Sequence, residues 1–221
     1  MVLEVMQREV PVRGIGYLIL RDCPEERLGE ALGKGMEKLK KVGAKHVYAT
    51  SLPEGEPLHD GPVGVWRLTH IHDMVDMERP LDALPKPERK LTLKPVKGQG
   101  EKDFLDLYNR SFLGVPNAGT YRPDDLKTPN LRHGLAYLDD ALVGVYVVDQ
   151  NDKTPVLAGL AIDEDRRRQG LGRDLLLTVL AALKAPVCHL TVSTANAPAA
   201  ALCEGCGFTR GETVSEWFEV V

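Results

Sequence analysis

Long hydrophobic runs are missing from this sequence. No segment approaches the ~18 consecutive apolar residues that a membrane-spanning helix needs. Residues 1–10 alternate apolar and charged side chains, so they also lack the apolar centre of a secretory signal peptide. We therefore expect a cytoplasmic protein without a membrane partner.

Cysteine is scarce, and a disulfide framework is not expected. The four cysteines are Cys23, Cys188, Cys203 and Cys206, and in a cytoplasmic chain such residues are more often reduced thiols than disulfide partners. Cys203 and Cys206 form a C-x-x-C pair. A zinc site would need two further ligands, for which Cys188 and His189 are the nearby candidates. We expect no metal at this pair.

An excess of one sign of charge is missing as well. The chain has 28 Lys and Arg against 32 Asp and Glu, which gives a net charge of −4. Since the two signs are interleaved, there is no global attraction toward nucleic acid. The length of 221 residues allows one large domain or two small ones, and it suffices to bury a core without a disulfide or a metal.

The chain divides at a proline-rich segment. Residues 1–80 predict two strands joined by a tight turn, a long amphipathic helix over 25–43, and two further strands. Residues 81–90 contain several prolines and charges and are predicted to be a linker. Residues 91–221 then alternate strands and helices again, which indicates a second and larger α/β domain.

The strongest local signal is a strand, a turn and a helix over residues 155–184. The turn carries the arginines Arg166–Arg168 and the glycines Gly170 and Gly172. It contains neither the Walker pattern nor the dinucleotide fingerprint. Unpaired amides at a helix N-terminus, glycine and arginine together favour an anion, and a pyrophosphate is the natural guest. On this pattern alone, an anion site and a purely structural turn are equally supported.

A second segment, residues 190–212, favours a specific kind of anion site over a purely structural turn. Arg167 to Gly172 match the acyl-CoA loop [Q/R]-x-x-G-x-[G/A]. Later positions match N-x-x-A-x-x-L-Y-E-x-x-G-F at Asn196, Ala199, Leu202, Glu204, Gly207 and Phe208. With the two motifs in this order, residues 91–221 resemble the GNAT superfamily of acyl-CoA-dependent N-acyltransferases. The resemblance implies an α/β (α+β) fold, with a mixed central sheet flanked by helices and preceded by a smaller αβ module.

The resemblance also implies a cosubstrate, acetyl-CoA, and a place for it. The pyrophosphate would lie on the amides of residues 168–173, and the pantetheine arm along strand 158–162. That strand and strand 187–193 would splay apart, and the N–H of Ile162 would donate to the thioester carbonyl. The expected coenzyme contacts are Ala161, Ile162, Arg167, Arg168, Gln169, Gly170, Leu171, Gly172, Arg173 and Asn196.

The implied reaction is direct attack of an amine on the thioester, which needs a base and an acid. Cys203 stands where the family usually has its acid tyrosine. Three interpretations remain open: the thiol is the acid, another group or water replaces it, or the domain is weakly active or inactive. His189, on the strand expected to flank the acceptor, is either a base or a core histidine.

The acceptor is not named by the sequence. Tyr121 and Arg122 follow the first helix, where the family forms its acceptor wall, so they are expected to contact substrate. Asp163–Asp165 are either solvated turn acids or a cation-recruiting group. We expect an amine of a small molecule or peptide as acceptor, and the resemblance leaves room for a homodimer. The alternative function is a non-catalytic acyl-CoA-binding or regulatory module.

Two further features complete the expectations. His70, His72, Asp73 and Asp76 resemble metal ligands, but on a strand Asp73 would face away from the others, which favours a solvated surface. Residues 1–80 have the strand order of the later half of a GNAT domain, with acids at 22–26 in place of the loop glycines. We interpret them as a degenerate, partial GNAT-like module without a coenzyme site.

Overall fold

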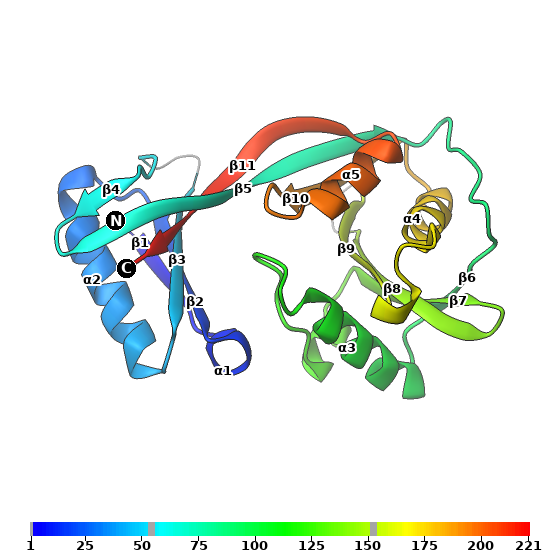
Figure 1. The fold of residues 1–221 in the computed structure, drawn as a ribbon, viewed down its shortest axis with the longest axis horizontal. Coiled ribbons are helices and arrows are strands. Elements are labelled where there is room, and N and C mark those ends of the chain that lie inside the picture. Colours follow the sequence, from blue (N-terminus) through cyan, green and yellow to red (C-terminus); the bar gives the residue numbers. More distant parts are fainter. Residues whose placement is uncertain (1, 53–55, 151–153) are drawn as a thin grey trace. The chain divides into compact units, whose positions relative to one another are not determined.

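A computed structural model describes residues 2–52, 56–150 and 154–221 (Figure 1). The chain forms two compact units. Unit 1 comprises Met1–Val75, Ser193–Ala195 and Thr213–Val221, and unit 2 comprises Asp76–Val192 and Asn196–Glu212. Among the described residues, no helix is both long and apolar enough to cross a bilayer.

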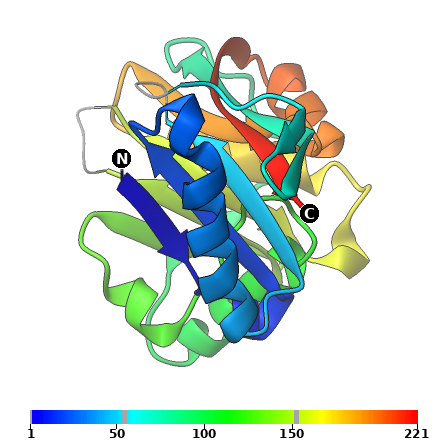
Figure 2. The same cartoon turned by 90° about the vertical axis from the view of Figure 1, so that its left-hand side faces the viewer.

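Unit 1 is a sheet covered by one long helix. Its strand order is β1-β2-β3-β11-β5, so the last strand of the chain lies between β3 and β5. Figure 2 shows α2 lying across these first strands. The elements that contribute to this unit are β1 (Val2–Met6), α1 (Val10–Arg13), β2 (Ile15–Arg21), α2 (Glu25–Lys41), β3 (His46–Ser51), β4 (Gly61–Val63), the first part of β5 (Trp66–Pro80) and the end of β11 (Thr209–Val220).

The apolar stripe of α2 explains why this helix forms and where it packs. Leu28, Leu32 and Leu39 recur at helical spacing and are buried, as the sequence predicts. The helix approaches β2 closely, because a Cβ added to Gly35 would lie 2.5 Å from Cδ2 of Leu18. Glycine at this position therefore sets the distance between helix and sheet.

Unit 2 is a mixed sheet with helices on both faces. Its strand order is β11-β5-β10-β9-β8-β7-β6, in which residues 76–80 of β5 lie between β10 and the start of β11. Its other elements are β6 (Thr92–Pro95), α3 (Gln99–Phe112), η1 (Pro123–Lys127), β7 (Leu131–Leu138), β8 (Ala141–Asp149), β9 (Val156–Ile162), η2 (Glu164–Arg166), α4 (Leu171–Ala181), β10 (Val187–Ser193) and α5 (Ala197–Gly205).

The two faces of the unit 2 sheet carry separate cores. On the α3 face, Phe104 and Tyr108 pack against Ala161 of β9. On the α4 face, helices α4 and α5 pack against the neighbouring residue Ile162. Adjacent strand residues point to opposite faces, so Ala161 and Ile162 belong to different cores. Figure 1 shows α3 on one side of β8 and β9 and α4 on the other.

Most predicted elements are confirmed, with three differences. Residues 10–13 form a short helix where two strands with a tight turn were expected, because Pro11 fixes a helical φ in its first turn. The short strand β4 was not expected. The closing strands are one strand, β11, which contributes to both units, as β5 does. Unit 2 therefore starts at Asp76, before the predicted linker 81–90.

The close contact of α2 with β2 generates a prediction with an internal control. Gly35→Ala should lower the free energy of unfolding by about 1–3 kcal/mol, because the new methyl group would overpack Leu18, which is fully buried. Gly33→Ala, in the same helix with only Trp66 Nε1 3.9 Å away, should raise it by about 0.5–1 kcal/mol. Urea unfolding followed by circular dichroism measures both free energies. Equal changes for Gly35→Ala and Gly33→Ala would contradict the close packing of α2 on β2.

Candidate functional site

The glycine–arginine turn begins helix α4, and the first amides of this helix lack an intrahelical partner. Gly170 is the N-cap residue of α4 with φ 80°, and Arg168 also has a positive φ of 62°. The first intrahelical bond is made by the N–H of Asp174, so the amides before it have no intrahelical partner. Exposed arginines and open amides at a helix N-terminus fit a pyrophosphate.

Two of the loop arginines also stabilise the backbone. Nε of Arg167 donates to the carbonyl oxygen of Ile162 at 3.2 Å, and Arg173 donates to that of Gly205 at 3.3 Å. Gln169 reaches back to the carbonyl of Asp165 at 3.5 Å. The loop is thus tied to the end of β9 and to α5, which keeps its amides in place.

The linker segment is held by a buried carboxylate beside this loop. Asp174 is 1% exposed and accepts the N–H of Glu88 at 2.8 Å and the guanidinium of Arg89 at 3.0 Å. Arg89 also lies against the loop, since a Cβ on Gly170 would be 3.3 Å from its Nη1. The sequence did not predict a role for Asp174 or Arg89. A single aspartate among the apolar residues of α4 could have indicated a buried carboxylate with a polar partner.

Strand β9 carries a bulge in its middle. Val147 of β8 pairs with Gly159, but the next residue, Val148, pairs with Leu157, so Ala158 is an extra residue in β9. A bulge bends its strand and ends regular pairing nearby. Gly159 beside it is required for close packing, because an added Cβ would lie 3.1 Å from Tyr108.

Beyond the bulge, one edge of β9 is open. Its ladder with the parallel strand β10 consists of one residue pair in the described structure, His189 with Val156. The N–H of Asp163 donates to Val143 of β8 at 2.9 Å. Because successive amides alternate sides, the N–H groups of Ile162 and Leu160 point away from β8, toward this open edge. This separation agrees with the expected splaying of the two strands.

The corresponding strands of unit 1 are closed. β2, α2 and β3 also form a strand–helix–parallel strand unit, but their ladder runs over six pairs, from Ile15–His46 to Leu20–Ser51. The turn between β2 and α2 contains Asp22, Cys23 and Pro24 and no glycine. An extended arm could pair with β9, but not with β2 on its β3 side.

Two other predicted coenzyme contacts are engaged in local structure. The side chain of Asn196 caps α5 by accepting the N–H of Ala199 at 3.3 Å. Ala161 pairs with Val145 of β8 and its methyl group belongs to the α3 core. The Oδ1 of Asn196 and the backbone of Ala161 therefore already have partners within the chain.

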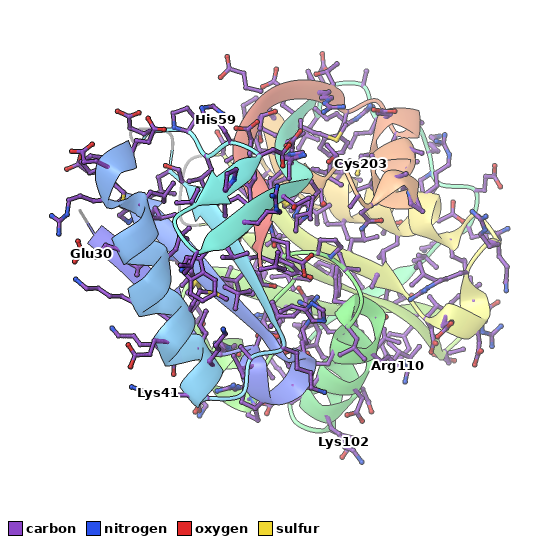
Figure 3. The ribbon with its side chains drawn as sticks, turned by 60° about the vertical axis from the view of Figure 1, so that its left-hand side comes forward. Glu30, Lys41, His59, Lys102, Arg110 and Cys203 are labelled. Atoms are coloured by element: carbon purple, nitrogen blue, oxygen red, sulfur yellow. The ribbon has the colours of Figure 1, made fainter. Side chains whose placement is uncertain are left out.

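Cys203 lies in the core of the α4 face. It is 8% exposed, on α5, in the same cluster as Cys188 and Cys206 (Figure 3). Burial raises its thiol pKa to about 12, and the neighbouring Cys206 and Glu204 add to the rise. The thiol is therefore protonated at neutral pH and is a weaker acid than a free tyrosine, whose pKa is about 10. All four cysteines are free, as expected.

His189 lies on the opposite face and is half-buried. Its neighbours Cys188 and Leu190 belong to the α4 core, so its ring is on the α3 face. Nδ1 is 3.3 Å from Oδ2 of Asp76, and Nε2 is 3.7 Å from Oε2 of Glu78. Both carboxylates come from β5, and neither was a predicted site residue.

Tyr121 belongs to an aromatic group on the same α3 face. Its ring centroid lies 4.5 Å from that of Tyr108 and 5.3 Å from that of His133. Asn109 holds its backbone from both sides, donating to the carbonyl at 2.9 Å and accepting the N–H at 2.8 Å. Burial lowers the pKa of His133, which keeps this group uncharged.

The exposed residues around Tyr121 make local contacts. The N–H of Arg122 donates to Asp125 at 2.6 Å and begins η1. Asp163, one of the candidate cation recruiters, accepts from Arg110 at 2.7 Å. Arg110 lies on α3 (Figure 3). Asp163 is thereby engaged in an ion pair, while Glu164 and Asp165 are exposed in η2.

The histidine–aspartate pattern of β5 needs a correction. The expectation that Asp73 faces away from His70 is wrong, because His70 Nε2 lies 2.7 Å from Asp73 Oδ1. Burial along β5 changes phase between His72 and Val75, so the strict alternation of a strand does not hold there. Glu216 of β11 joins them, with ligand atoms of the three residues within 4.8 Å of one another. His72 is buried and stacks on Trp217 instead.

A bulged strand with an open edge, followed by a glycine loop at a helix N-terminus, can hold an extended ligand that carries a phosphate. Residues 101–208 match the sequence model described as the Acetyltransferase (GNAT) family. Residues 101–208 of the chain are thus a GNAT acetyltransferase domain.

Two curated relatives are named mycothiol acetyltransferase. The one from Thermomonospora curvata is 28% identical over 161 residues, covering 65% of this chain and 54% of the relative. The one from Thermobispora bispora is 31% identical over 169 residues, covering 65% and 56%. The chain thus spans about half the length of the curated relatives it matches.

A solved structure shares the fold over nearly the whole chain. The GCN5-related N-acetyltransferase from Sphaerobacter thermophilus has a TM-score of 0.62 and 16% sequence identity, covering 99% of this chain and 74% of its own. At this identity the similarity shows the fold alone. That fold includes residues of both units.

The buried carboxylate of Asp174 generates a prediction for the loop. Asp174→Ala should lower the free energy of unfolding by about 2–3 kcal/mol, because the Glu88 amide and the Arg89 guanidinium lose their acceptor. Asp174→Asn should cost less, since an amide oxygen still accepts the Glu88 N–H. Chemical unfolding measures both against Asp106→Ala, an exposed acid of α3. Equal free energies of unfolding for Asp174→Ala, Asp174→Asn and Asp106→Ala would refute the role of the buried carboxylate.

Proposed function

We propose that the protein is an N-acetyltransferase that moves an acetyl group from acetyl-CoA to a primary amine of a small molecule or peptide. The observation that carries the proposal is the open edge of β9 leading to the loop at the start of α4. The names of the two relatives favour a small-molecule amine. The four free, buried thiols support a reducing compartment such as the cytoplasm.

The chain offers a continuous set of donors for the coenzyme. The amides of 168–173 and the arginines around them would hold the pyrophosphate. The N–H groups of Leu160 and Ile162 lie about 7 Å apart along one strand edge, as two residues of a strand do, and would pair with the pantetheine arm and the thioester carbonyl. The coenzyme supplies an activated acyl group, and the residues hold it against β9.

The α3 face supplies the proton acceptor. We assign this role to His189. This residue pairs with Val156, at the point beyond which β9 and β10 separate. The amine nitrogen gives one proton to the imidazole and forms the C–N bond. The C–S bond breaks, and its electron pair leaves with the sulfur, which then takes up one proton. Tyr121 and Arg122 are proposed to border the acceptor on the α3 side.

Cys203 is proposed to pack and not to donate that last proton. With a thiol pKa of about 12 and a place in the α4 core, it is poorly suited to protonate a thiolate. Water or another group then does so, which was one of the interpretations that the sequence left open.

Replacing the thiol tests this assignment. Cys203→Ala should keep kcat within about threefold and lower the free energy of unfolding, because it removes a buried group. Thiol release measured across pH 6–9 would reveal the role. A loss of kcat by roughly a hundredfold with the fold intact would identify Cys203 as the acid.

We also propose that residues 1–80 are a partial GNAT-like module without its own coenzyme site, followed by the linker 81–90 and the acetyltransferase domain 91–221. The continuous β2–β3 ladder and the acidic turn after β2 support this. The strand residues Asp76–Pro80 are this module's contribution to the unit 2 sheet.

Calorimetry with acetyl-CoA tests the coenzyme site. The chain should bind one coenzyme, and Gly170→Val should weaken binding about tenfold or more, since a side chain at φ 80° strains the turn and covers the amides. Gly205→Ala, with open space around it, is the matched control. Two bound coenzymes would contradict the closed unit 1, and no binding would refute the proposal.

Turnover separates the enzyme from its alternative. Wild-type protein with acetyl-CoA and a panel of primary amines should release free thiol in proportion to acetylated amine. Coenzyme binding without thiol release from any amine would favour the non-catalytic binding module.

A further inference from the structure

We propose that Asp76 and Glu78 of β5, with His189 of β10, form the subsite that recognises the acceptor as an ammonium ion. This inference rests on the proposed function and adds two residues and a substrate class to it. The acceptor is an amine that is positively charged when it arrives. The carboxylates that bind this amine come from β5, whose residues from Asp76 onward belong to unit 2.

The three side chains share one face of the sheet. Met77, between the two carboxylates, belongs to the α4 core, so Asp76 and Glu78 point to the α3 face, as His189 does. On that face the side chains remain accessible, at 38% for Asp76, 56% for Glu78 and 33% for His189. The same face carries the aromatic group of Tyr108 and Tyr121.

The distances around the ring assign different roles to the two carboxylates. A carboxylate only accepts, so the contact of Asp76 with Nδ1 at 3.3 Å requires the proton on Nδ1. In the neutral ring, Nε2 is then an acceptor, and it faces Oε2 of Glu78 at 3.7 Å. In this state Nε2 and the Glu78 carboxylate both accept hydrogen bonds, so they cannot bond to each other and both remain available to a donor. An ammonium group can donate one N–H to Nε2 and another to Glu78. It gives one proton to Nε2 before it attacks, and the second proton leaves the nitrogen after the C–N bond forms and passes through water to the departing sulfur.

Asp76 is a positioning residue in this arrangement, and Glu78 binds substrate. Asp76 fixes the tautomer that leaves Nε2 free to accept a proton. Glu78 attracts the ammonium and holds it beside His189. On the β11 side, glycine leaves Asp76 uncovered, because a Cβ added to Gly211 would lie 3.6 Å from its Oδ2.

The position along the strands supports the same roles. His189 and Val156 are the last ladder pair before the edge of β9 opens toward the loop at 168–173. A coenzyme bound at that loop would extend back along β9, so its acyl end would approach the His189–Val156 pair, where β9 and β10 still lie side by side. The amine bound at Glu78 and His189 therefore meets the thioester from the α3 face.

Kinetics with two amines of different charge test the subsite. Benzylamine is an ammonium ion at neutral pH, whereas aniline is neutral. Glu78→Gln should raise KM for benzylamine about tenfold or more, with kcat nearly unchanged and aniline unaffected, because a charge-assisted hydrogen bond is lost. Glu78→Asp keeps the negative charge, so its KM for benzylamine should lie between that of the wild type and that of Glu78→Gln.

Asp76→Asn should instead lower kcat about tenfold for both amines, since the ring loses its fixed tautomer while the binding carboxylate remains. Gly211→Val should raise KM for benzylamine without changing any charge. Asp82→Asn, an exposed acid of the segment 81–90, is the control and should change neither constant. Variants of Asp76 and Glu78 that behave like this control in an active enzyme would overturn the inference.

A binding experiment keeps the inference separate from the proposed function. In the presence of coenzyme A, benzylammonium should shift the NMR signals of the His189 ring in the wild type and at least tenfold more weakly in Glu78→Gln. If this shift occurs while no amine is acetylated, the proposed function fails and the subsite stands. If the wild-type signals do not move with millimolar benzylammonium, the subsite is refuted.

Discussion

The separation of β9 from β10 is the feature on which the rest of the candidate site depends. In a continuous parallel ladder the amides of β9 would be consumed by β10, as those of β2 are by β3 in unit 1. One extra residue, Ala158, interrupts the regular pleat, and the two strands keep one pair. The exposed strand edge and the unpaired amides of the α4 turn together form one line of donors for an extended, phosphate-bearing ligand.

Keeping that edge open requires support from elsewhere in unit 2. The β8 ladder holds β9 from its other side, and the α3 aromatic group packs on Gly159. Arg167 ties the loop to the end of the strand, and the buried Asp174 ties residues 88 and 89 to the first turns of α4. A polar chain segment is thereby fixed at the helix N-terminus, where its arginine adds positive charge.

The relation of the N-terminal part to the site follows from the strand order. Residues 76–80 enter the unit 2 sheet beside β10, and the end of β11 enters the unit 1 sheet beside β3. Within unit 2, these residues of β5 place Asp76 and Glu78 next to His189 of β10.

By itself, the sequence determined the long helix α2, the strand, turn and helix over residues 155–184, and the GNAT motifs, because hydrophobic period, turn chemistry and short motifs are local. It also predicted a role for the loop residues 167–173 and for His189, which stays a prediction. Only the tertiary structure decided that Cys203 is buried, that Asp73 meets His70, that Arg89 lies against Gly170, and that Asp76 and Glu78 flank His189. Each of these depends on which strands lie side by side or where a strand changes phase, and contacts between residues 80 or more positions apart leave no local pattern to read.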